Sequence, residues 1–277
     1  MSFLGLDLGG TKVSVGLLGS AGEFTPKSYE VVRDDVEIVD HLVSVIEDHR
    51  ESDLRGVGLC VPGWMSLDRS EVLFAPHRPS LIGQRLAEIL TNRIGVPVEV
   101  DNDANTAAYL EVQIGALQGI DCGVVVNFGT GLGVGVVLNG VVQRGAHGFA
   151  GEIGHSYFGG DDRCACGARG CLELALRHSF FTNDDARCER DARRERYLDL
   201  AGVALQWTVR AWDPSIIVIG GGIGVESSKF LADLESRLYD RLGATYPDSY
   251  PSLVRATALG HAGAYGAALM SAASMDR

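Results

Sequence analysis

The sequence predicts two related α/β domains that face one another. The main observation is an internal duplication: an apolar strand, a glycine turn and a second apolar strand occur over residues 3–18 and again over 123–138. Asp7 in the first copy aligns with Asn127 in the second. A second observation is that strand and helix patterns alternate along the rest of the chain, as they do in α/β proteins.

The first half of the chain contains short apolar runs and segments with helical spacing. In chain order we expect strands at 3–8 and 13–18 around a tight turn at 9–12, a helix at 36–50, a strand at 56–61 ending at Pro62-Gly63, a helix at 82–93, a strand at 96–100 and an alanine-rich helix at 104–117. The residues between the last strand and the last helix are Asp101-Asn102-Asp103.

The second half repeats the strand, turn and strand and then alternates again. We expect a helix at 197–212, a strand at 215–219 that ends at Gly220-Gly221-Gly222, and helices at 228–242 and 262–273. Residues 183–196 mix both charge signs densely, which is typical of a solvated loop or helix face. The predicted domains are residues 1–117 together with the C-terminal helix 263–277, and the larger unit 118–262.

Composition excludes several classes of function. The chain has 277 residues, of which 46% are hydrophobic, so it can bury a sizeable core. The formal charge of −12 argues against non-specific binding to nucleic acid or anionic membranes, because both need a basic protein surface. Without a leader or a long apolar run, we expect a cytoplasmic protein. Glycine is in excess, at 36 residues, or 13% of the chain.

The two glycine turns predict a phosphate site. A glycine run after a strand can simply close a hairpin. Two such turns in related positions favour an anion site instead, because the backbone N–H groups freed at Gly129, Gly131 and Gly133 form a nest, and Thr11 and Thr130 add hydroxyl donors. Neither turn has the Walker pattern, and none of the glycine runs has the Rossmann pattern.

Asp101-Asn102-Asp103 is a candidate catalytic segment. An Asp or Asn just before a helix can be a plain N-cap. Two acids and an amide opposite a phosphate cradle also supply a general base with neighbours to orient it, and phosphoryl transfer needs little more than a base, positioned phosphates and a metal ion.

A cysteine-rich segment predicts a metal site. Cys164, Cys166 and Cys171 have the spacing C-x-C-x₄-C, and His155 lies nine residues before the first of them. Four such ligands suit tetrahedral Zn²⁺, whereas unpaired thiols are the alternative. The spacing is not that of a nucleic-acid-binding finger.

Taken in order, these motifs resemble the ROK family of sugar kinases, whose best-known members are bacterial glucokinases. The resemblance is carried by the following segments: Leu6-Asp7-Leu8-Gly9-Gly10-Thr11-Lys12, Val61-Pro62-Gly63, Asn102-Asp103-Ala104-Asn105, Gly129-Thr130-Gly131-Leu132-Gly133, Gly151-Glu152-Ile153-Gly154-His155, the cysteine segment through Glu173, and Gly220-Gly221-Gly222. It implies an α/β actin-like ATPase (ribonuclease H-like) fold with two domains around a central cleft.

The resemblance also implies roles for individual residues. Asp103 is the expected base for the sugar 6-hydroxyl, and Asp7 the expected partner of ATP-bound Mg²⁺. The implied sugar-binding residues are Gly63, Asn102, Asp103, Glu152, His155 and Glu173. Those implied for the nucleotide and its phosphates are Asp7, Gly9, Gly10, Thr11, Lys12, Thr130, Gly131, Gly133, Gly221 and Gly222. His155, Cys164, Cys166 and Cys171 are the implied ligands of a structural Zn²⁺.

The expected function is therefore that of an ATP-dependent hexose 6-phosphotransferase, and the leading hypothesis is a glucokinase. An amino-sugar kinase acting on kanosamine, glucosamine, N-acetylglucosamine or N-acetylmannosamine is an alternative, since the segment around His77 departs from glucokinases. A catalytically inactive sugar-binding or regulatory ROK protein is an alternative of another class. The expected partners are a sugar, ATP and a second copy of the chain in a homodimer, with no nucleic acid and no membrane.

Overall fold

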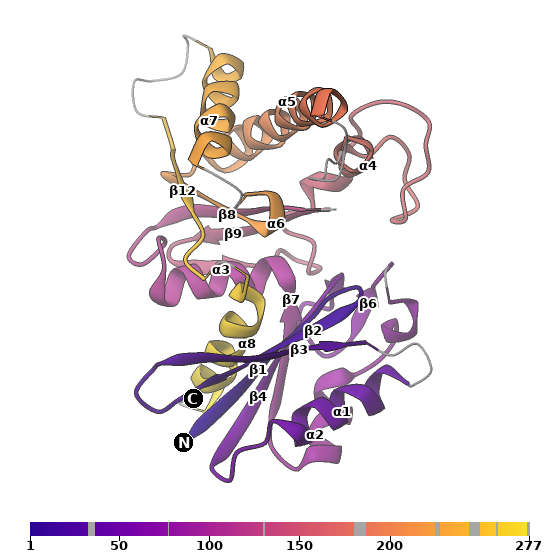
Figure 1. Ribbon diagram of the computed structural model, residues 1–277, viewed down its shortest axis with the longest axis vertical. Coiled ribbons are helices and arrows are strands. Elements are labelled where there is room, and N and C mark those ends of the chain that lie inside the picture. The colour runs from indigo at the N-terminus through magenta and orange to yellow at the C-terminus, as the bar shows by residue number, and fades with distance from the viewer. Residues whose placement is uncertain are drawn as a thin grey trace.

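A computed structural model describes residues 1–32, 37–76, 78–129, 131–179, 187–224, 228–243, 250–258 and 260–275. Two five-stranded sheets form two layers of the molecule, one above the other in Figure 1, with helices between them and on their outer faces. Each sheet has its own apolar core on its outer side, beneath the covering helices.

The first sheet has the strand order β3-β2-β1-β4-β7. Its strands are β1 (Ser2–Leu8), β2 (Lys12–Leu18), β3 (Phe24–Val31), β4 (Leu54–Val61) and β7 (Val98–Asn102). β1 pairs antiparallel with β2 and parallel with β4, which in turn pairs parallel with β7. Because parallel strands end at the same edge of a sheet, Asp7, Gly63 and Asn102 are brought to one edge.

The second sheet repeats this pattern with the order β10-β9-β8-β11-β12. Its strands are β8 (Cys122–Phe128), β9 (Leu132–Leu138), β10 (Val141–Gln143), β11 (Ile216–Gly220) and β12 (Ser252–Arg255). β8 pairs antiparallel with β9 and parallel with β11. Asp7 and Asn127 are each the penultimate residue of the central strand of their sheet. The duplication predicted from the sequence is therefore confirmed.

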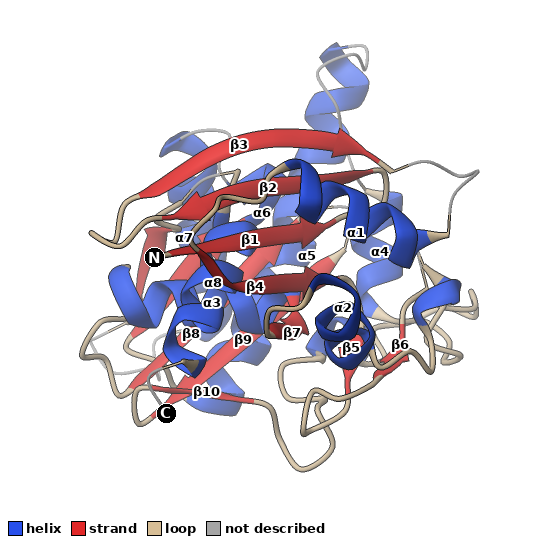
Figure 2. Ribbon diagram, turned by 90° about the horizontal axis from the view of Figure 1, so that it is seen from below, coloured by secondary structure: helices blue, strands red, loops and turns tan. Residues whose placement is uncertain are grey.

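Helices fill the space between the sheets and cover their outer faces. α3 (Asp103–Ile114) and α8 (Ala262–Ser274) contact each other between the two sheets. α1 (Ile38–Asp48) and α2 (Leu86–Ile94) lie in front of the first sheet in Figure 2. The second sheet is covered by α4 (Leu172–His178), α5 (Arg187–Trp212), α6 (Gly221–Gly224) and α7 (Ser228–Leu242). The short strands β5 (Trp64–Met65) and β6 (Val72–Phe74) form a separate hairpin. None of the described helices is long and apolar enough to cross a membrane.

One predicted helix was wrong in extent, and an edge strand of the first sheet was not predicted. α5 begins at Arg187 instead of residue 197, because its charged first turns pair with α7: Arg194 binds Asp233, and Arg237 binds Glu195 and Asp199. β3 was not predicted, because it is an edge strand whose residues are mostly exposed or half-buried and so lacks a buried apolar run. Residues 183–186 of the charged segment lie outside the described residues.

Candidate active site

A cleft of about 330 Å³ opens where the central strands of both sheets end. Of the residues that the sequence singles out, those lining it are Asp7, Gly9, Gly10, Gly63, Asn102, Asp103, Gly131, Gly133, Glu152, His155, Glu173 and Gly221. Gly222 lines an adjoining pocket that also reaches Asp7, Asp103 and Gly221. Within the described part of the chain, Thr11 and Lys12 are exposed and do not line the cleft. Thr130 lies outside the described residues.

Asp103 is the first residue of α3, directly after the parallel strand β7. The N-cap is Asn102, whose Oδ1 accepts a hydrogen bond of 2.7 Å from the backbone N–H of Asn105. The Asp103 carboxylate accepts a hydrogen bond of 2.8 Å from its neighbour, the backbone N–H of Ala104, and among the described residues no side chain binds it. The capping role that the sequence left open therefore belongs to Asn102, and the carboxylate of Asp103 is available to the cleft.

Burial raises the pKa of several carboxyl groups here. Desolvation, followed by the negative charge of Asp7, raises the pKa of Asp103 to about 6, although its side chain can still be reached by solvent inside the cleft. Desolvation raises the pKa of Glu152 to about 7 and also raises that of Asp7, where a hydrogen bond from the Cys60 thiol partly offsets it. These groups, together with Glu173, give the cleft a strongly acidic lining that suits hydroxyl groups and a cation.

An aromatic wall stands beside these acids. The ring of Trp64 lies 4.5 Å from that of Phe74, 4.9 Å from Phe149 and 5.5 Å from His155, measured between ring centres. Trp64 and Phe74 line the cleft. Such a surface packs well against the apolar face of a sugar ring. Sequence reasoning did not include Trp64 among the site residues, although its position directly after Gly63 could have indicated it.

Two glycines in the cleft, Gly63 and Gly221, are needed for close approach of the backbone. Gly63 has φ +121° and Gly221 has φ +80°, values that L side chains rarely adopt. A Cβ atom on Gly221 would lie 2.2 Å from the carbonyl oxygen of Phe128, so that only glycine fits.

Two arginines that the sequence did not single out also lie at the site. At the first glycine turn the guanidinium of Arg78 donates to the carbonyl oxygen of Gly10. Arg177 lines the cleft from α4, four residues after Glu173, and this helical spacing could have indicated it.

The predicted metal ligands form one cluster. The ligand atoms of His155, Cys164, Cys166 and Cys171 all lie within 4.8 Å of one another. His155 Nδ1 is 3.5 Å from the Cys164 sulfur, and the sulfurs of Cys166 and Cys171 are 3.7 Å apart. A tetrahedral Zn²⁺ site holds such atoms about 3.5 to 3.8 Å apart. Nε2 of His155 lies 3.8 Å from a carboxylate oxygen of Glu152, so this histidine belongs to both the cluster and the cleft.

Comparison with known proteins places this arrangement in a family. The sequence profile described as "ROK family" matches residues 3–273. The chain belongs to the ROK family. A curated glucokinase from Halalkalibacterium halodurans is 31% identical over 281 residues, which cover 84% of each protein.

Solved structures agree with the assignment to the ROK family. A ROK glucokinase from Streptomyces griseus, in complex with glucose and AMPPNP, superposes with a TM-score of 0.86 at 26% identity, over 99% of this chain and all of that one. A ROK hexokinase from Thermus thermophilus matches with a TM-score of 0.76 at 30% identity, over 100% and 99% of the two chains. The fold is thus the actin-like ATPase fold that the resemblance to the ROK family implied.

Proposed function

We propose that this ROK protein is an ATP-dependent hexose kinase that phosphorylates the 6-hydroxyl of glucose. The observation that carries the proposal is the cleft in which Asp103, with its raised pKa, stands near Asp7 and between the two glycine turns. The glucokinase relatives and the glucose-bound Streptomyces neighbour support glucose as the acceptor.

In the proposed reaction the sugar lies on the side of Trp64. Glu152, His155, Glu173, Asn102 and the backbone of Gly63 supply hydrogen-bond partners for its hydroxyls, which need partners once water is expelled. The carboxylate of Asp103 accepts the proton of the 6-hydroxyl as that oxygen forms its bond to the γ-phosphorus. The bond from the γ-phosphorus to the bridging oxygen of ATP breaks, and ADP leaves with the electron pair.

The phosphate side consists of backbone groups and one acid. Gly9, Gly10, Gly131 and Gly133 line the cleft where they can cradle phosphate oxygens. The adjoining pocket at Gly221 and Gly222 extends this region toward the nucleotide. Asp7 would hold Mg²⁺ through water, and that ion would neutralise charge on the β- and γ-phosphates. We further propose that residues 1–117 with 263–277, and residues 118–262, are the two domains around this cleft.

The test is an assay of ADP release across glucose, glucosamine, N-acetylglucosamine, N-acetylmannosamine, kanosamine, fructose and allose. We expect the highest kcat/KM with glucose. A preference for an amino sugar would overturn the assignment of the acceptor while leaving kinase chemistry in place. An absence of ADP release with every sugar, in protein that still binds ATP, would contradict the proposed reaction.

Activity should depend on pH through Asp103. A protonated carboxyl group cannot accept a proton, so with a pKa of about 6 the base is active above that pH and is lost as pH falls. We expect kcat/KM to fall by about tenfold per pH unit below 6 and to level off above 7. The measurement is a pH–rate profile for kcat/KM. An acidic limb near pH 4, the range of an unperturbed Asp, would contradict the proposed environment of the base.

We also propose that the cluster of His155 and three cysteines holds a structural Zn²⁺, because its donor atoms fit in kind and spacing. The ion would fix the loop that brings His155 and Glu152 to the sugar. Cys166→Ser should lower zinc content and weaken glucose binding about tenfold or more, since losing a group that orients a ligand typically costs this much. The measurements are metal analysis and titration calorimetry.

Cys122→Ser is the matched control for the zinc prediction. Cys122 lies outside the cluster and its thiol donates to the carbonyl oxygen of Trp212, a bond that a serine hydroxyl can keep. This control should retain both zinc and affinity for glucose. Unchanged affinity in verified zinc-free protein would show that the cluster does not position the sugar site.

A further inference from the structure

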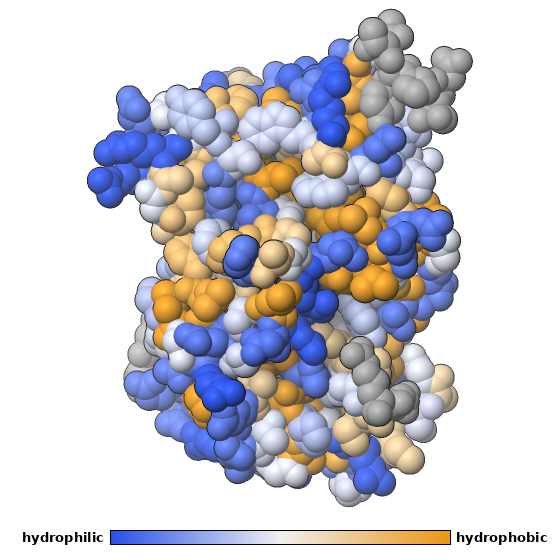
Figure 3. All heavy atoms as spheres, turned by 180° about the vertical axis from the view of Figure 1, so that it is seen from behind, coloured by the Kyte–Doolittle hydropathy of each residue, from blue (hydrophilic) through white to orange (hydrophobic). Residues whose placement is uncertain are grey.

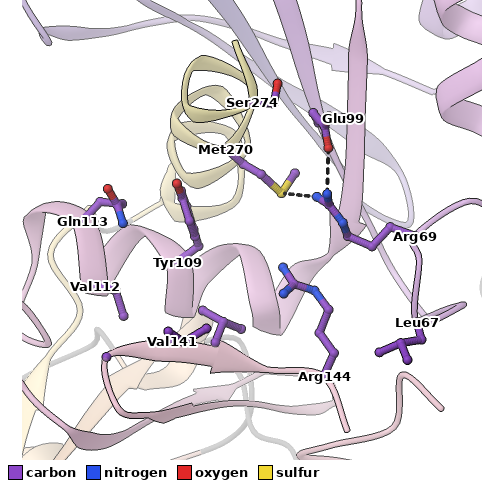
Figure 4. A pocket seen from close by; sticks show the side chains of 12 residues that line it. Leu67, Arg69, Glu99, Tyr109, Val112, Gln113, Val141, Arg144, Met270 and Ser274 are labelled. Atoms are coloured by element: carbon purple, nitrogen blue, oxygen red, sulfur yellow. Dashed lines mark hydrogen bonds and ion pairs between the residues drawn. The ribbon is translucent and has the colours of Figure 1, made fainter. Parts of the chain in front are cut away.

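A second cavity, of about 500 Å³, lies between the two sheets and is separate from the cleft. In the part of the chain that the structure describes, the two share no lining residue. Its walls come from the β5–β6 loop, β7, α3, the region around β10, and the last turns of α8 (Figure 4). On the back of the molecule, hydrophobic groups gather near the waist between the two sheets (Figure 3). A molecule in this cavity would therefore touch elements of both halves.

Two guanidinium groups with unused donors face this cavity. Arg69 binds Glu99 through one nitrogen at 3.0 Å. Among the described residues its other terminal nitrogen donates only to the thioether sulfur of Met270, a weak acceptor, at 3.2 Å. Arg144 binds the buried Asp101 through Nε and Nη2, and its Nη1 has no partner among the described residues. Figure 4 shows both guanidiniums in the same region of the cavity.

The backbone holds Arg69 in a conformation that is unusual for arginine. Its φ is +61°, in the left-handed region that glycine and asparagine favour. The loop is fixed by Asp68, whose carboxylate accepts from the hydroxyls of Ser66 and Ser70, at 2.7 and 2.8 Å, and from the N–H of Ser70 at 3.1 Å. A strained arginine on a rigid loop is consistent with a requirement for its side chain.

The remaining lining indicates the class of ligand. Tyr109, Gln113 and Ser274 offer hydroxyl and amide groups, whereas Leu67 and Val141 are apolar and more than half exposed. Guanidinium donors suit a phosphate, whose oxygens can bind two of them at once. We infer that this cavity binds a hydroxylated phosphate monoester, the chemical class of a hexose 6-phosphate. That identity rests on the proposed function, because a hexose 6-phosphate is its product.

Occupancy of the cavity is connected to the catalytic segment. Asp101, the partner of Arg144, is 1% exposed, and its Oδ1 accepts from the backbone N–H of Asn102 at 2.8 Å and from Nδ2 of Asn105 at 3.1 Å. Asp103 follows two residues later. A phosphate bound to Arg144 competes with Asp101 for its guanidinium group and weakens that ion pair. The bound ligand thereby disturbs the segment from Asp101 to Asp103 and lowers kcat. The product would thus regulate the reaction from outside the cleft.

The test is titration calorimetry of the full chain with glucose 6-phosphate while saturating glucose and AMPPNP occupy the cleft. Arg69→Asn removes one guanidinium and should fold well, because asparagine tolerates the left-handed backbone. Val141→Trp fills the cavity from an exposed position. We expect 1:1 binding that weakens at least tenfold in each variant. Arg85→Asn, which removes an exposed arginine just before α2, is the matched control and should bind as the parent does.

Binding that disappears when glucose and AMPPNP are present, or that is equal in the parent, Arg69→Asn and Val141→Trp, would overturn the site. Inhibition of kcat by glucose 6-phosphate in the parent but not in Arg69→Asn is the expected kinetic result, and equal inhibition in both would overturn the regulatory role. Failure of the proposed function is a different result, since it would appear as no ADP release with any sugar.

Discussion

Replacing Asp103 with asparagine should lower kcat by about 10²–10⁴-fold, the range that a positioned general base contributes. Asparagine keeps the shape of the side chain and can still accept from the N–H of Ala104, but it cannot take the proton of the sugar hydroxyl. Asn102, which caps α3, is unchanged. We therefore expect glucose binding to survive while turnover is lost. Steady-state kinetics and calorimetry on the same protein separate the two effects.

The same substitution should also change the unfolding temperature, and the change should depend on pH. The pKa of Asp103 is raised from 3.8 to about 6, so the folded protein holds its proton more tightly than the unfolded chain. The ionised carboxylate therefore destabilises the folded protein. This destabilisation is complete above pH 6 and absent below about pH 4. Asp103→Asn should unfold at a higher temperature than the parent at pH 8, but not at pH 4. Asp48→Asn, at the exposed end of α1, should change neither kcat nor this difference. Unchanged turnover in Asp103→Asn would remove Asp103 from the mechanism.

The duplicated strand, turn and strand could be predicted from the sequence because they depend on local patterns of apolar residues and glycines. Buried strands such as β1 and β8 are continuous apolar runs, and each is followed directly by glycines. The candidate metal ligands are close in sequence, so their spacing alone predicts a cluster. Asp103 could be proposed because a strand and a helix start flank it within a few residues.

The parts that could not be predicted depend on contacts between distant segments. Arg144 reaches Asp101 across 43 residues, and Arg144 itself belongs to no motif that the sequence indicated. The aromatic wall joins Trp64 to Phe149, which lie in different halves of the chain. β12 pairs with β11 only after the long excursion through α7. Hydrophobic periodicity cannot show such pairings, because each segment taken alone has the pattern of an ordinary surface segment or an ordinary core segment.

The glycine excess has a structural component as well as a catalytic one. Gly5 on β1 and Gly58 on β4 lie beneath α8, and a Cβ on either would meet that helix's backbone, at 1.9 Å from the carbonyl oxygen of Ala264 and 1.8 Å from that of Ala267. Glycine thus lets the C-terminal helix rest directly on the first sheet. At the start of the same helix, a Cβ on Gly263 would lie 2.4 Å from a carboxylate oxygen of Asp7. The position of α8 therefore bears on the acid expected to hold Mg²⁺.

Gly58→Ala should accordingly destabilise the protein by about 3 kcal/mol, near the upper end of what overpacking usually costs, because backbone atoms cannot move aside as a side chain can. Chemical denaturation measures the effect. Gly56→Ala is the matched control on the same strand: its Cβ would meet the Ser271 hydroxyl at 2.6 Å, which can rotate away, so a change within about 1 kcal/mol is expected. Equal stabilities for the two variants would show that α8 can shift off the sheet freely. A loss of activity in Gly58→Ala that exceeds its loss of folded protein would instead show that the packing of α8 on the first sheet positions Asp7.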